Sequence, residues 1–457
     1  MSNELDQPTG EVSNVYNKLK ATDVAKYENV SNLQALQRVL YRLAKLDKTR
    51  RFHAIYDKLT RNDVMWMAWV NVAKNNGSPG VDGVSIESIE NEGLEGIKAF
   101  LGKLGEEVKS NTYRPLPLKR VNIPKAQKPN ELRPLGIPAL RDRVLMSAAK
   151  VVLEPIFEAD FKPESYGFRP KRNTHQALDE IRINANSGAH FVLDADIKSC
   201  FDEIDHDALM ALIEKRISDR SMLKLLRSWL RAGILEGNQY SKSETGTPQG
   251  SPISPLLANI ALSALDEALI KAKTTTGKLI RYADDFVVVC PTKERAENAL
   301  NVAQSAIAPL GLRIHPTKTK IINLKGGQEG FDFLGFHNHM VRSKRLNGRF
   351  YLLRWPSDKA MASIKAKVKE MTNRRYVGIE LETIINWLNP ILKGWHAYFK
   401  HGNSSKKFKV VNSYVHQRLA LLASDKHGLS GRNWAKRFNY QWISSLGIFR
   451  LTSIFAL

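Results

Sequence analysis

The chain has 457 residues, 43% of them hydrophobic and 25% charged, which is typical of a globular protein with roughly two to four domains. The formal charge of +23 indicates a polyanionic partner, such as nucleic acid or an acidic membrane surface. No window approaches the roughly 18 apolar residues of a membrane span, and the polar N-terminus has no apolar signal core. Two cysteines cannot build a cysteine-ligated zinc finger, and so few cysteines fit a reducing compartment such as the cytoplasm.

The N-terminal region, residues 1–70, is expected to be an extension that is only partly helical. Its first 30 residues are polar, and we expect them to be loosely ordered. From Leu33 to about Trp69 apolar residues recur at helical spacing, which predicts helices. The glycine-rich stretch 75–83 then predicts a loop, but it lacks the Gly-Lys-Ser/Thr ending of a nucleotide-binding P-loop.

A proline-rich basic stretch predicts an antiparallel hairpin with strands over 121–125 and 132–138. Pro134 cannot donate to a sheet, so the hairpin should lie at a sheet edge or be irregular. Lys125 and Arg133 lie on opposite arms, where they could face one ligand or be ordinary surface charges.

Two helices are predicted beside proline-rich segments. The first covers 141–154 and should end at Pro155. The second covers 256–269 and follows the rigid loop 245–255, Thr-Gly-Thr-Pro-Gln-Gly-Ser-Pro-Ile-Ser-Pro.

Residues 191–197 predict a strand that carries Asp196 near its end. A helix should follow, capped by either Asp205 or Asp207. The strand therefore delivers one carboxylate to the edge of a sheet.

A second pair of carboxylates lies in the segment 279–289, where two short apolar runs flank Asp284 and Asp285. The runs are rich in β-branched and aromatic residues, which predicts a hairpin with the two carboxylates at its tip. The alternative is an ordinary polar turn, because aspartate is common in turns.

The next elements are a helix over 293–310 that ends at Gly311, a strand over 314–322 and a strand over 331–336. Strands and helices thus alternate from about residue 115 to 340, with an antiparallel hairpin among them. This pattern predicts an α+β sheet domain.

The C-terminal region predicts helices and carries most of the charge. Three amphipathic stretches after residue 355 predict a small helical bundle, and the second contains Pro390. Residues 341–457 hold 22 Lys and Arg against 5 Asp and Glu, a surplus of 17, together with five of the eight tryptophans. Basic residues interleaved with aromatic ones favour nucleic-acid binding over a merely solvated face.

Asp196, Asp284 and Asp285 converge if their strands are neighbours in the sheet. Oxygen ligands of this kind suit Mg²⁺, which prefers few carboxylates together with substrate phosphates. A pair of such ions stabilises the attacking and leaving oxygens of a phosphoryl displacement.

The sequence resembles the reverse transcriptases encoded by group II introns, also called maturases. Tyr282-Ala283-Asp284-Asp285, preceded by Asp196, resembles their polymerase palm. The other matching stretches are 80–83, 132–138, 166–170, 247–252, 318–319 and 333–336, and they occur in the family's order. Residues 392–399, Leu-Lys-Gly-Trp-His-Ala-Tyr-Phe, resemble the family's thumb.

The resemblance implies a right-hand polymerase fold with four parts: the N-terminal extension 1–70, fingers and palm 71–345, an all-α thumb or maturase domain 346–430, and a short basic DNA-binding tail 431–457. It implies an RNA-directed DNA polymerase that copies intron RNA with two Mg²⁺ ions and dNTPs. It also implies maturase activity in splicing, retromobility, and partners that include the intron RNA, an RNA template with a DNA primer, and target DNA, in the cytoplasm and away from membranes.

The resemblance also assigns roles to single residues. Asp196, Asp284 and the Ile197 carbonyl would hold the metal ions, with Asp285 in support. The incoming dNTP would be bound by six residues: Lys125, Arg133, Phe201, Gln249, Gly250 and Lys318. Phe201 would exclude a 2′-hydroxyl, or else be a core phenylalanine, and Lys318 would protonate pyrophosphate, or else be a surface lysine.

One feature of many family members is missing, since the chain stops at Leu457 without the paired cysteines of their endonuclease domain. We therefore expect no cleavage of the second DNA strand. Two alternatives remain open: a non-enzymatic splicing factor on a decayed polymerase fold, and a reverse transcriptase adopted for defence or repair. The retained Asp196, Asp284 and Asp285 argue against the first alternative.

Overall fold

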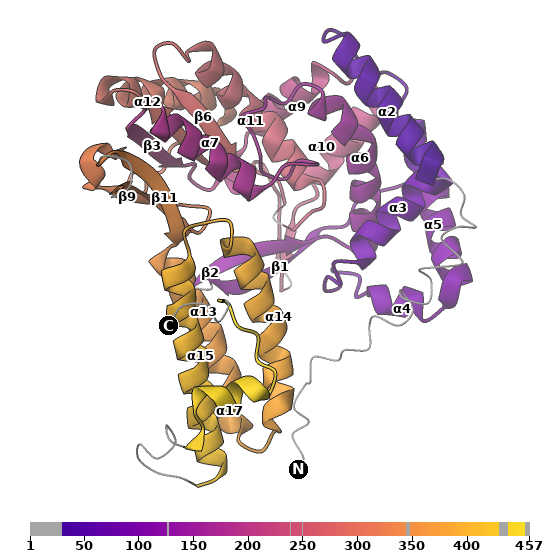
Figure 1. Ribbon diagram of the computed structural model, residues 1–457. Helices are drawn as coiled ribbons and strands as arrows, with labels where there is room; N and C mark the ends of the chain where they lie inside the picture. The colour runs from indigo at the N-terminus through magenta and orange to yellow at the C-terminus, as the bar shows by residue number, and fades with distance from the viewer. Residues whose placement is uncertain are drawn as a thin grey trace. The chain divides into compact units, whose positions relative to one another are not determined.

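The computed structural model describes residues 30–125, 128–237, 239–248, 250–343, 348–428 and 437–452. The chain divides into two compact units, each built from several stretches of sequence (Figure 1). The first unit contains the described residues up to Pro163 with Lys198–Leu265 and Ala306–Arg313. The second contains Glu164–Ile197, Asp266–Ser305 and the described residues from Ile314 onward. Among the described residues, no helix combines the length and apolarity that crossing a bilayer requires.

The first unit is mainly helical. Its helices are α2 (Val30–Leu46), α3 (Asn62–Ala73), α4 (Ile86–Glu90), α5 (Gly93–Lys109), α6 (Leu140–Glu158), α8 (Cys200–Glu203), α9 (His206–Glu214) and α10 (Arg220–Leu230), with short 3-10 turns η1 (Tyr56–Thr60) and η2 (Ala308–Leu310). Helix α6 is buried along most of its length and packs against α2 and α3. The helices predicted between Leu33 and Trp69 are therefore present as α2 and α3.

A four-stranded sheet in the order β2-β1-β4-β5 completes the first unit. Its strands are β1 (Leu118–Lys125), β2 (Lys128–Ile137), β4 (Ile234–Glu236) and β5 (Gln239–Ser241). Strands β1 and β2 form the predicted antiparallel hairpin, with Asn122 paired to Pro134. Strand β2 is an edge strand, as the missing N–H group of Pro134 requires.

Helix α6 corrects one prediction, because it runs through Pro155 to Glu158 instead of ending there. Proline at this position cannot donate to the carbonyl of Val151. The side chain of Gln37, from α2, donates to that carbonyl instead, at 3.2 Å. A contact from a distant helix thus satisfies the group that Pro155 leaves unpaired.

The second unit contains two sheets. The first has the order β6-β7-β3-β8, with strands β3 (Phe191–Asp196), β6 (Lys278–Tyr282), β7 (Asp285–Cys290) and β8 (Lys320–Asn323). The second has the order β11-β10-β9, with strands β9 (Gly330–Phe333), β10 (Phe336–Arg342) and β11 (Phe350–Pro356). Helix α7 (Thr174–Asn186) packs against β6, β7 and β11, and it begins with a capping box between Asn173 and Gln176.

Two strand predictions in this unit need correction. The predicted strand 314–322 is regular only from Lys320, because residues after Ile314 form a turn in which the Thr319 amide donates to the His315 carbonyl. The predicted strand 331–336 is a hairpin, since Leu334 and Gly335 adopt φ of 49° and 78° and reverse the chain. Left-handed conformations at both central residues are those of a tight two-residue hairpin loop.

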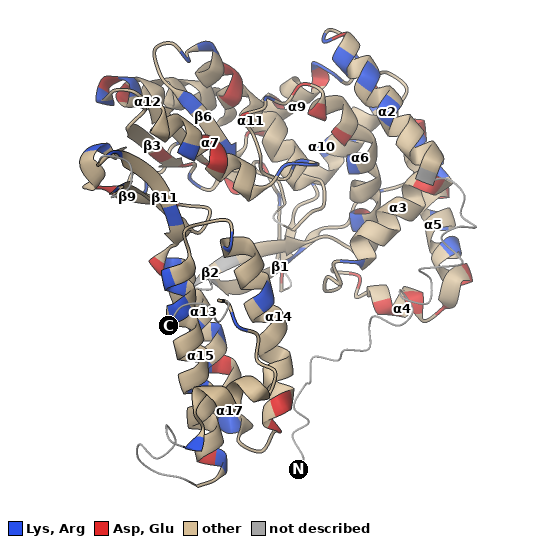
Figure 2. Cartoon of the chain, in the orientation of Figure 1, with Lys and Arg blue, Asp and Glu red and all other residues tan. Residues whose placement is uncertain are grey.

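Three helices follow the second sheet, as predicted: α13 (Asp358–Met371), α14 (Leu381–Phe399) and α15 (Ser405–Lys426). The same region contains the 3-10 turn η4 (Arg374–Tyr376) and a further short helix, α17 (Tyr440–Ser445), whereas the 3-10 turn η3 (Lys325–Gly327) lies between β8 and β9. Figure 2 shows Lys and Arg recurring along α13, α14 and α15. One buried core continues from both sheets into these helices and includes Phe438, Ile443 and Leu451 near the C-terminus.

Helices α11 (Ser254–Lys271) and α12 (Lys293–Ile307) contribute residues to both units. Helix α12 leads through η2 to Gly311 at φ 73°, the predicted C-terminal glycine. The α+β fold class predicted from the sequence is confirmed.

Candidate active site

Strand β3 lies inside its sheet, between β7 and β8, and brings the three predicted carboxylates to one place in the second unit. Asp196, the last residue of β3, is paired in register with Asp285, the first residue of β7. Asp284 lies in the turn that joins β6 to β7. The convergence that the sequence predicted for Asp196, Asp284 and Asp285 is therefore present in the backbone.

The turn before Asp285 is held in an uncommon conformation. Ala283 has φ of 58°, in the left-handed region that residues with a Cβ rarely adopt. Gly167 packs so closely on this turn that a Cβ there would lie 2.3 Å from the Ala283 nitrogen. The sequence Tyr166-Gly167-Phe168-Arg169-Pro170 thus supports the hairpin, and only glycine fits at its second position.

A buried ion pair fixes the strand that leads into the turn. Arg281, in β6, makes two bonds of 2.6 Å to the Asp266 carboxylate, and both side chains are fully buried. The same guanidinium donates to the Ala283 carbonyl at 2.9 Å. Asp266 therefore orients Arg281, and Arg281 holds the backbone of the turn that carries Asp284.

Lys318 and Ile197 flank Asp196. The turn at residues 315–319 brings the Lys318 ammonium into an ion pair with the Asp196 carboxylate. The Asp196 carbonyl accepts from the His315 amide at 2.8 Å, within a short antiparallel bridge between Ile197 and Ile314. In a pair of this kind the Ile197 carbonyl points away from residue 314, so it is placed to accept another ligand.

The surroundings of Asp285 raise its pKa. Desolvation, followed by repulsion from Asp284 and Asp196, raises the pKa of Asp285 to about 6, while Lys318 lowers it. Asp285 keeps some exposure to solvent, and repulsion from the two neighbouring carboxylates adds to the effect of desolvation on its pKa. A cation bound here would relieve that repulsion.

Asp194 is a further carboxylate near this site that the sequence analysis did not identify. Burial raises its pKa to about 7, and repulsion from Asp285, Asp332 and Asp196 adds to the effect. Asp194 and Asp196 are two residues apart on one strand, so both side chains leave the same face of the sheet. That spacing was visible in the sequence and could have identified Asp194.

The residue types fit divalent metal ions. Asp196, Asp284 and the Ile197 carbonyl offer only oxygen ligands, and the carboxylates of Asp194 and Asp285 lie near them. Within the described part of the chain, no three His, Cys, Asp or Glu side chains are already arranged as a metal-binding group. Magnesium sites commonly combine one or two carboxylates with substrate phosphates, so an incomplete protein cage is compatible with such a site.

Apart from Lys318, which belongs to the second unit, the residues expected at the nucleotide lie in stretches of the first unit. Arg133, in β2, is paired with Ile123, two residues from Lys125 at the end of β1, so the backbones of Lys125 and Arg133 lie on opposite arms of the hairpin as predicted. The side chains of both, and the whole of Gln249, lie outside the described residues. Gly250 has φ of 111°, and a Cβ there would lie 3.0 Å from the Gly136 carbonyl, so the loop 247–252 packs on β2.

Phe201 is half-buried in α8 of the first unit. Its carbonyl accepts from the Thr247 amide at 2.6 Å, which ties it to the same loop as Gly250. Asp205, one of the two predicted caps, caps α9 by accepting from the Ala208 amide. The loop 245–250 is thus anchored on the segment that follows β3 in the sequence.

Comparison with known families gives two matches. Residues 123–338 match the reverse transcriptase (RNA-dependent DNA polymerase) family model, and residues 361–440 match the group II intron maturase-specific domain. The first matched region runs from within β1 into β10, and the second runs from within α13 to the first residue of α17.

Individual relatives agree with these matches. The group II intron-encoded protein LtrA of Lactococcus lactis subsp. cremoris is 39% identical over 49% of this chain, but this chain covers only 36% of LtrA. The protein YkfC of Escherichia coli K12 is 31% identical over 72% of this chain and 93% of YkfC. Among solved structures, the telomerase of Candida albicans covers 77% of this chain and 68% of its own, with 13% identity and a TM-score of 0.41.

The family matches therefore agree with the order of motifs and with the carboxylates at the end of β3 and the tip of the β6–β7 hairpin. Reverse transcriptases are RNA-directed DNA polymerases and use divalent metal ions. The chain belongs to the group II intron reverse transcriptases and maturases.

Proposed function

We propose that the protein copies group II intron RNA into DNA, assists the splicing of that intron, and supports its retromobility. The register pairing of Asp196 with Asp285, beside Asp284 in the turn, is the observation that supports polymerisation most directly. The maturase-specific match supports the splicing function. We expect the protein to work in the cytoplasm, bound to nucleic acid.

Asp196, Asp284 and the Ile197 carbonyl would hold two Mg²⁺ ions, with Asp285 in support. Such ions stabilise the attacking primer oxygen and the departing pyrophosphate. Lys318 donates to Asp196 in the structure, so protonation of pyrophosphate by Lys318 requires that ion pair to open. The geometry thus suggests that Lys318 alternates between holding Asp196 and serving the leaving group.

Residues of the first unit would bind the nucleotide. Lys125 and Arg133 would neutralise the triphosphate, and the β1–β2 hairpin suits that task because its two arms carry one residue each. Gly250 and Gln249 would line the nucleotide and template side. At Gly250 the close approach to the Gly136 carbonyl leaves no room for a larger side chain.

The polymerase proposal is tested with Asp284→Ala. This variant should lose primer extension on an RNA template with Mg²⁺ and dNTPs, because a carboxylate that holds metal is gone. Asp57→Ala removes an exposed carboxylate that pairs with Lys58, and it should extend normally. Robust DNA synthesis by the Asp284→Ala variant, at an unchanged melting temperature, would show that Asp284 does not hold the catalytic metal ions.

Sugar selection is tested with Phe201→Ala. If the ring lies under the sugar, its removal should raise the incorporation of rNTPs relative to dNTPs, measured with single nucleotides. The half-buried ring in the structure leaves part of its surface available for such a contact. Unchanged discrimination would make Phe201 a packing residue.

The splicing role can be separated from polymerisation. The Asp284→Ala variant should still promote splicing, because RNA binding does not need the carboxylate. Lys406→Ala with Lys409→Ala removes two exposed charges from α15 and should weaken splicing while sparing extension, whereas Lys407 pairs with Asp358 and is better left in place. A parallel loss of splicing and extension in the lysine variant would contradict two separate RNA surfaces.

Binding of target DNA by the tail 431–457 is part of the same proposal. The structure describes residues 437–452 of it, where Arg450 lies over the Tyr440 ring, 4.9 Å from its centre. Arg432, Trp434 and Lys436 lie outside the described residues.

A further inference from the structure

Helix α10 in the first unit has one strongly basic face. Arg220, Lys224, Arg227 and Arg231 follow one another at intervals of four, three and four residues, which places them along one side of the helix. The opposite side is buried and consists of Met222, Leu225, Leu226, Trp229 and Leu230. The basic residues are therefore not scattered charges but one stripe on an amphipathic helix, here called the α10 stripe.

The α10 stripe lines an open depression of about 520 Å³ on the first unit. Leu223, Ser228 and Glu214 of α9 complete its lining. Arg227 bonds to Asp207 at 3.2 Å and to Glu214 at 3.1 Å, so these two acids already have a cation. Among the described residues, Arg220, Lys224 and Arg231 form no ion pair, and all three are exposed.

The length of the stripe favours a polymeric anion over a small one. Eleven residues of helix span about 16 Å at roughly 1.5 Å per residue. Neighbouring phosphates of one strand are separated by about 3.4 Å along a duplex axis, so the stripe could meet several of them. A single phosphate would instead need donors that converge on one point.

An aromatic residue stands beside the C-terminal end of the helix. Tyr240, in β5, packs on Gly233, where an added Cβ would lie 2.5 Å from the tyrosine ring. The Tyr240 side chain is nevertheless 54% exposed. Gly233 lies two residues after Arg231, so the exposed Tyr240 ring that packs on it lies near the end of the stripe. Such a ring offers a surface on which an unpaired RNA base can stack.

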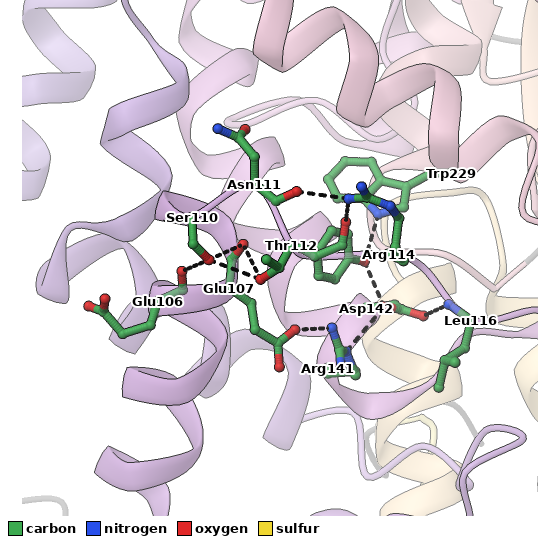
Figure 3. A network of polar contacts seen from close by, with 11 residues as sticks. Glu106, Glu107, Ser110, Asn111, Thr112, Arg114, Leu116, Arg141, Asp142 and Trp229 are labelled. Carbon is green, nitrogen blue, oxygen red and sulfur yellow. Dashed lines mark hydrogen bonds and ion pairs between the residues drawn. The ribbon is translucent and has the colours of Figure 1, made fainter.

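The buried side of α10 is fixed to the unit's core, as Figure 3 shows. The Trp229 indole donates to the Tyr113 hydroxyl at 2.9 Å, and that hydroxyl donates to the Asp142 carboxylate at 2.6 Å. The basic stripe is consequently presented on a helix whose orientation is set from within, which lowers the entropy lost on binding.

We propose that the α10 stripe binds the phosphate backbone of structured RNA, namely the intron RNA, as a surface separate from that of the C-terminal helices. This inference rests on the proposed maturase function. It adds a contact region outside residues 361–440, which match the maturase-specific domain.

The test uses the full chain with Arg220→Gln, Lys224→Gln and Arg231→Gln combined, leaving the paired Arg227 in place. The control carries the same charge change on α5, as Lys98→Gln, Lys103→Gln and Lys109→Gln, all at exposed positions. Binding to a folded group II intron RNA is measured over a range of KCl concentrations, and extension is measured on a short primer–template.

The stripe variant should bind the intron RNA about tenfold more weakly, with a log–log salt slope shallower by about 2, because three phosphate contacts are lost. The α5 control should bind like the wild type, and both variants should extend the short primer–template normally. Unchanged affinity and slope in the stripe variant overturn the inference, as does a parallel loss of primer extension. Failure of the wild-type protein to bind the intron RNA at all would instead overturn the proposed function.

Discussion

Asp142 of the first unit and Asp266 of the second are almost completely buried, and their surroundings compensate the carboxylate differently. Asp142, 1% exposed in the first unit, accepts from the uncharged Tyr113 hydroxyl and Leu116 amide (Figure 3). The Arg141 guanidinium is close, but its Nε is 3.9 Å away and beyond hydrogen-bond distance. Burial raises the pKa of Asp142 to about 6 despite these bonds.

Asp266, fully buried in the second unit, instead faces a full positive charge on Arg281. The same guanidinium donates to the Ala283 carbonyl, so the ion pair also positions the turn that carries Asp284. A neutral donor would hold that carbonyl less strongly. The difference teaches that a buried carboxylate can be satisfied by uncharged donors, or by a cation whose further contact is needed beside the active-site turn.

The largest effect is expected from breaking the ion pair in the second unit. Arg281→Met leaves the Asp266 carboxylate buried without a partner, which should lower the free energy of unfolding by about 3–5 kcal/mol. Urea titration of the full chain, followed by circular dichroism, measures the loss.

Removing both charges sharpens this prediction. The double variant Asp266→Leu with Arg281→Met should regain most of the lost stability, because no buried charge is left unpaired. It should still extend primers poorly, since the Ala283 carbonyl has lost its donor from Arg281. Equal stability of the single and double variants would show that Asp266 and Arg281 are not coupled.

A smaller effect is expected from pH at Asp142. Its folded pKa of about 6 lies above the ordinary value of 3.8, so its contribution to stability is complete below pH 3.8 and is lost as the pH rises through 6. At about 1.4 kcal/mol per pKa unit, the loss approaches 3 kcal/mol at neutral pH.

Asp142→Asn isolates this contribution, because asparagine does not titrate. The difference in unfolding free energy between the wild type and Asp142→Asn should change between pH 4 and 7, whereas other carboxyl groups cancel in the difference. Asparagine has one amide oxygen, so it can accept from the Tyr113 hydroxyl or from the Leu116 amide but not from both as the carboxylate does, and this adds only an offset independent of pH. A difference that is constant with pH would contradict the raised pKa of the Asp142 carboxyl.

The order of motifs made much of the fold predictable. The β1–β2 hairpin, its edge position and the α+β class followed from Pro134, from alternation and from turn residues. The meeting of Asp196 with Asp284 and Asp285 followed from the acids' places at strand ends, because carboxylates at the same edge of a sheet are neighbours.

The secondary-structure predictions that failed did so because of contacts and backbone conformations that only the tertiary structure reveals. Pro155 does not end α6, because the Gln37 side chain donates to the Val151 carbonyl in place of the amide that proline lacks. Gln37 and Val151 are 114 residues apart in the sequence. The apolar run ending at Phe336 contains no turn residue except Gly335, and the left-handed Leu334 beside it was not predictable. The roles of Lys125, Arg133, Phe201, Gln249, Gly250 and Lys318 stay predictions.

The smallest effect is expected from Trp229→Phe, which tests whether the donors around Asp142 act as one network. The variant removes the indole N–H that donates to the Tyr113 hydroxyl, and the hydrogen bond alone should be worth about 1 kcal/mol. That donated bond makes the tyrosine a better donor to Asp142, so its loss should weaken the support of the charged carboxylate more than that of the neutral one. Trp229→Phe should therefore destabilise the protein more at pH 7 than at pH 4. Trp69, equally buried in the same unit and in edge-to-face contact with Phe100, provides the control, since Trp69→Phe removes similar ring area away from Asp142 and should cost the same at both pH values. Equal losses at the two pH values for Trp229→Phe would mean that the tryptophan only packs, and that Tyr113 supports Asp142 without it.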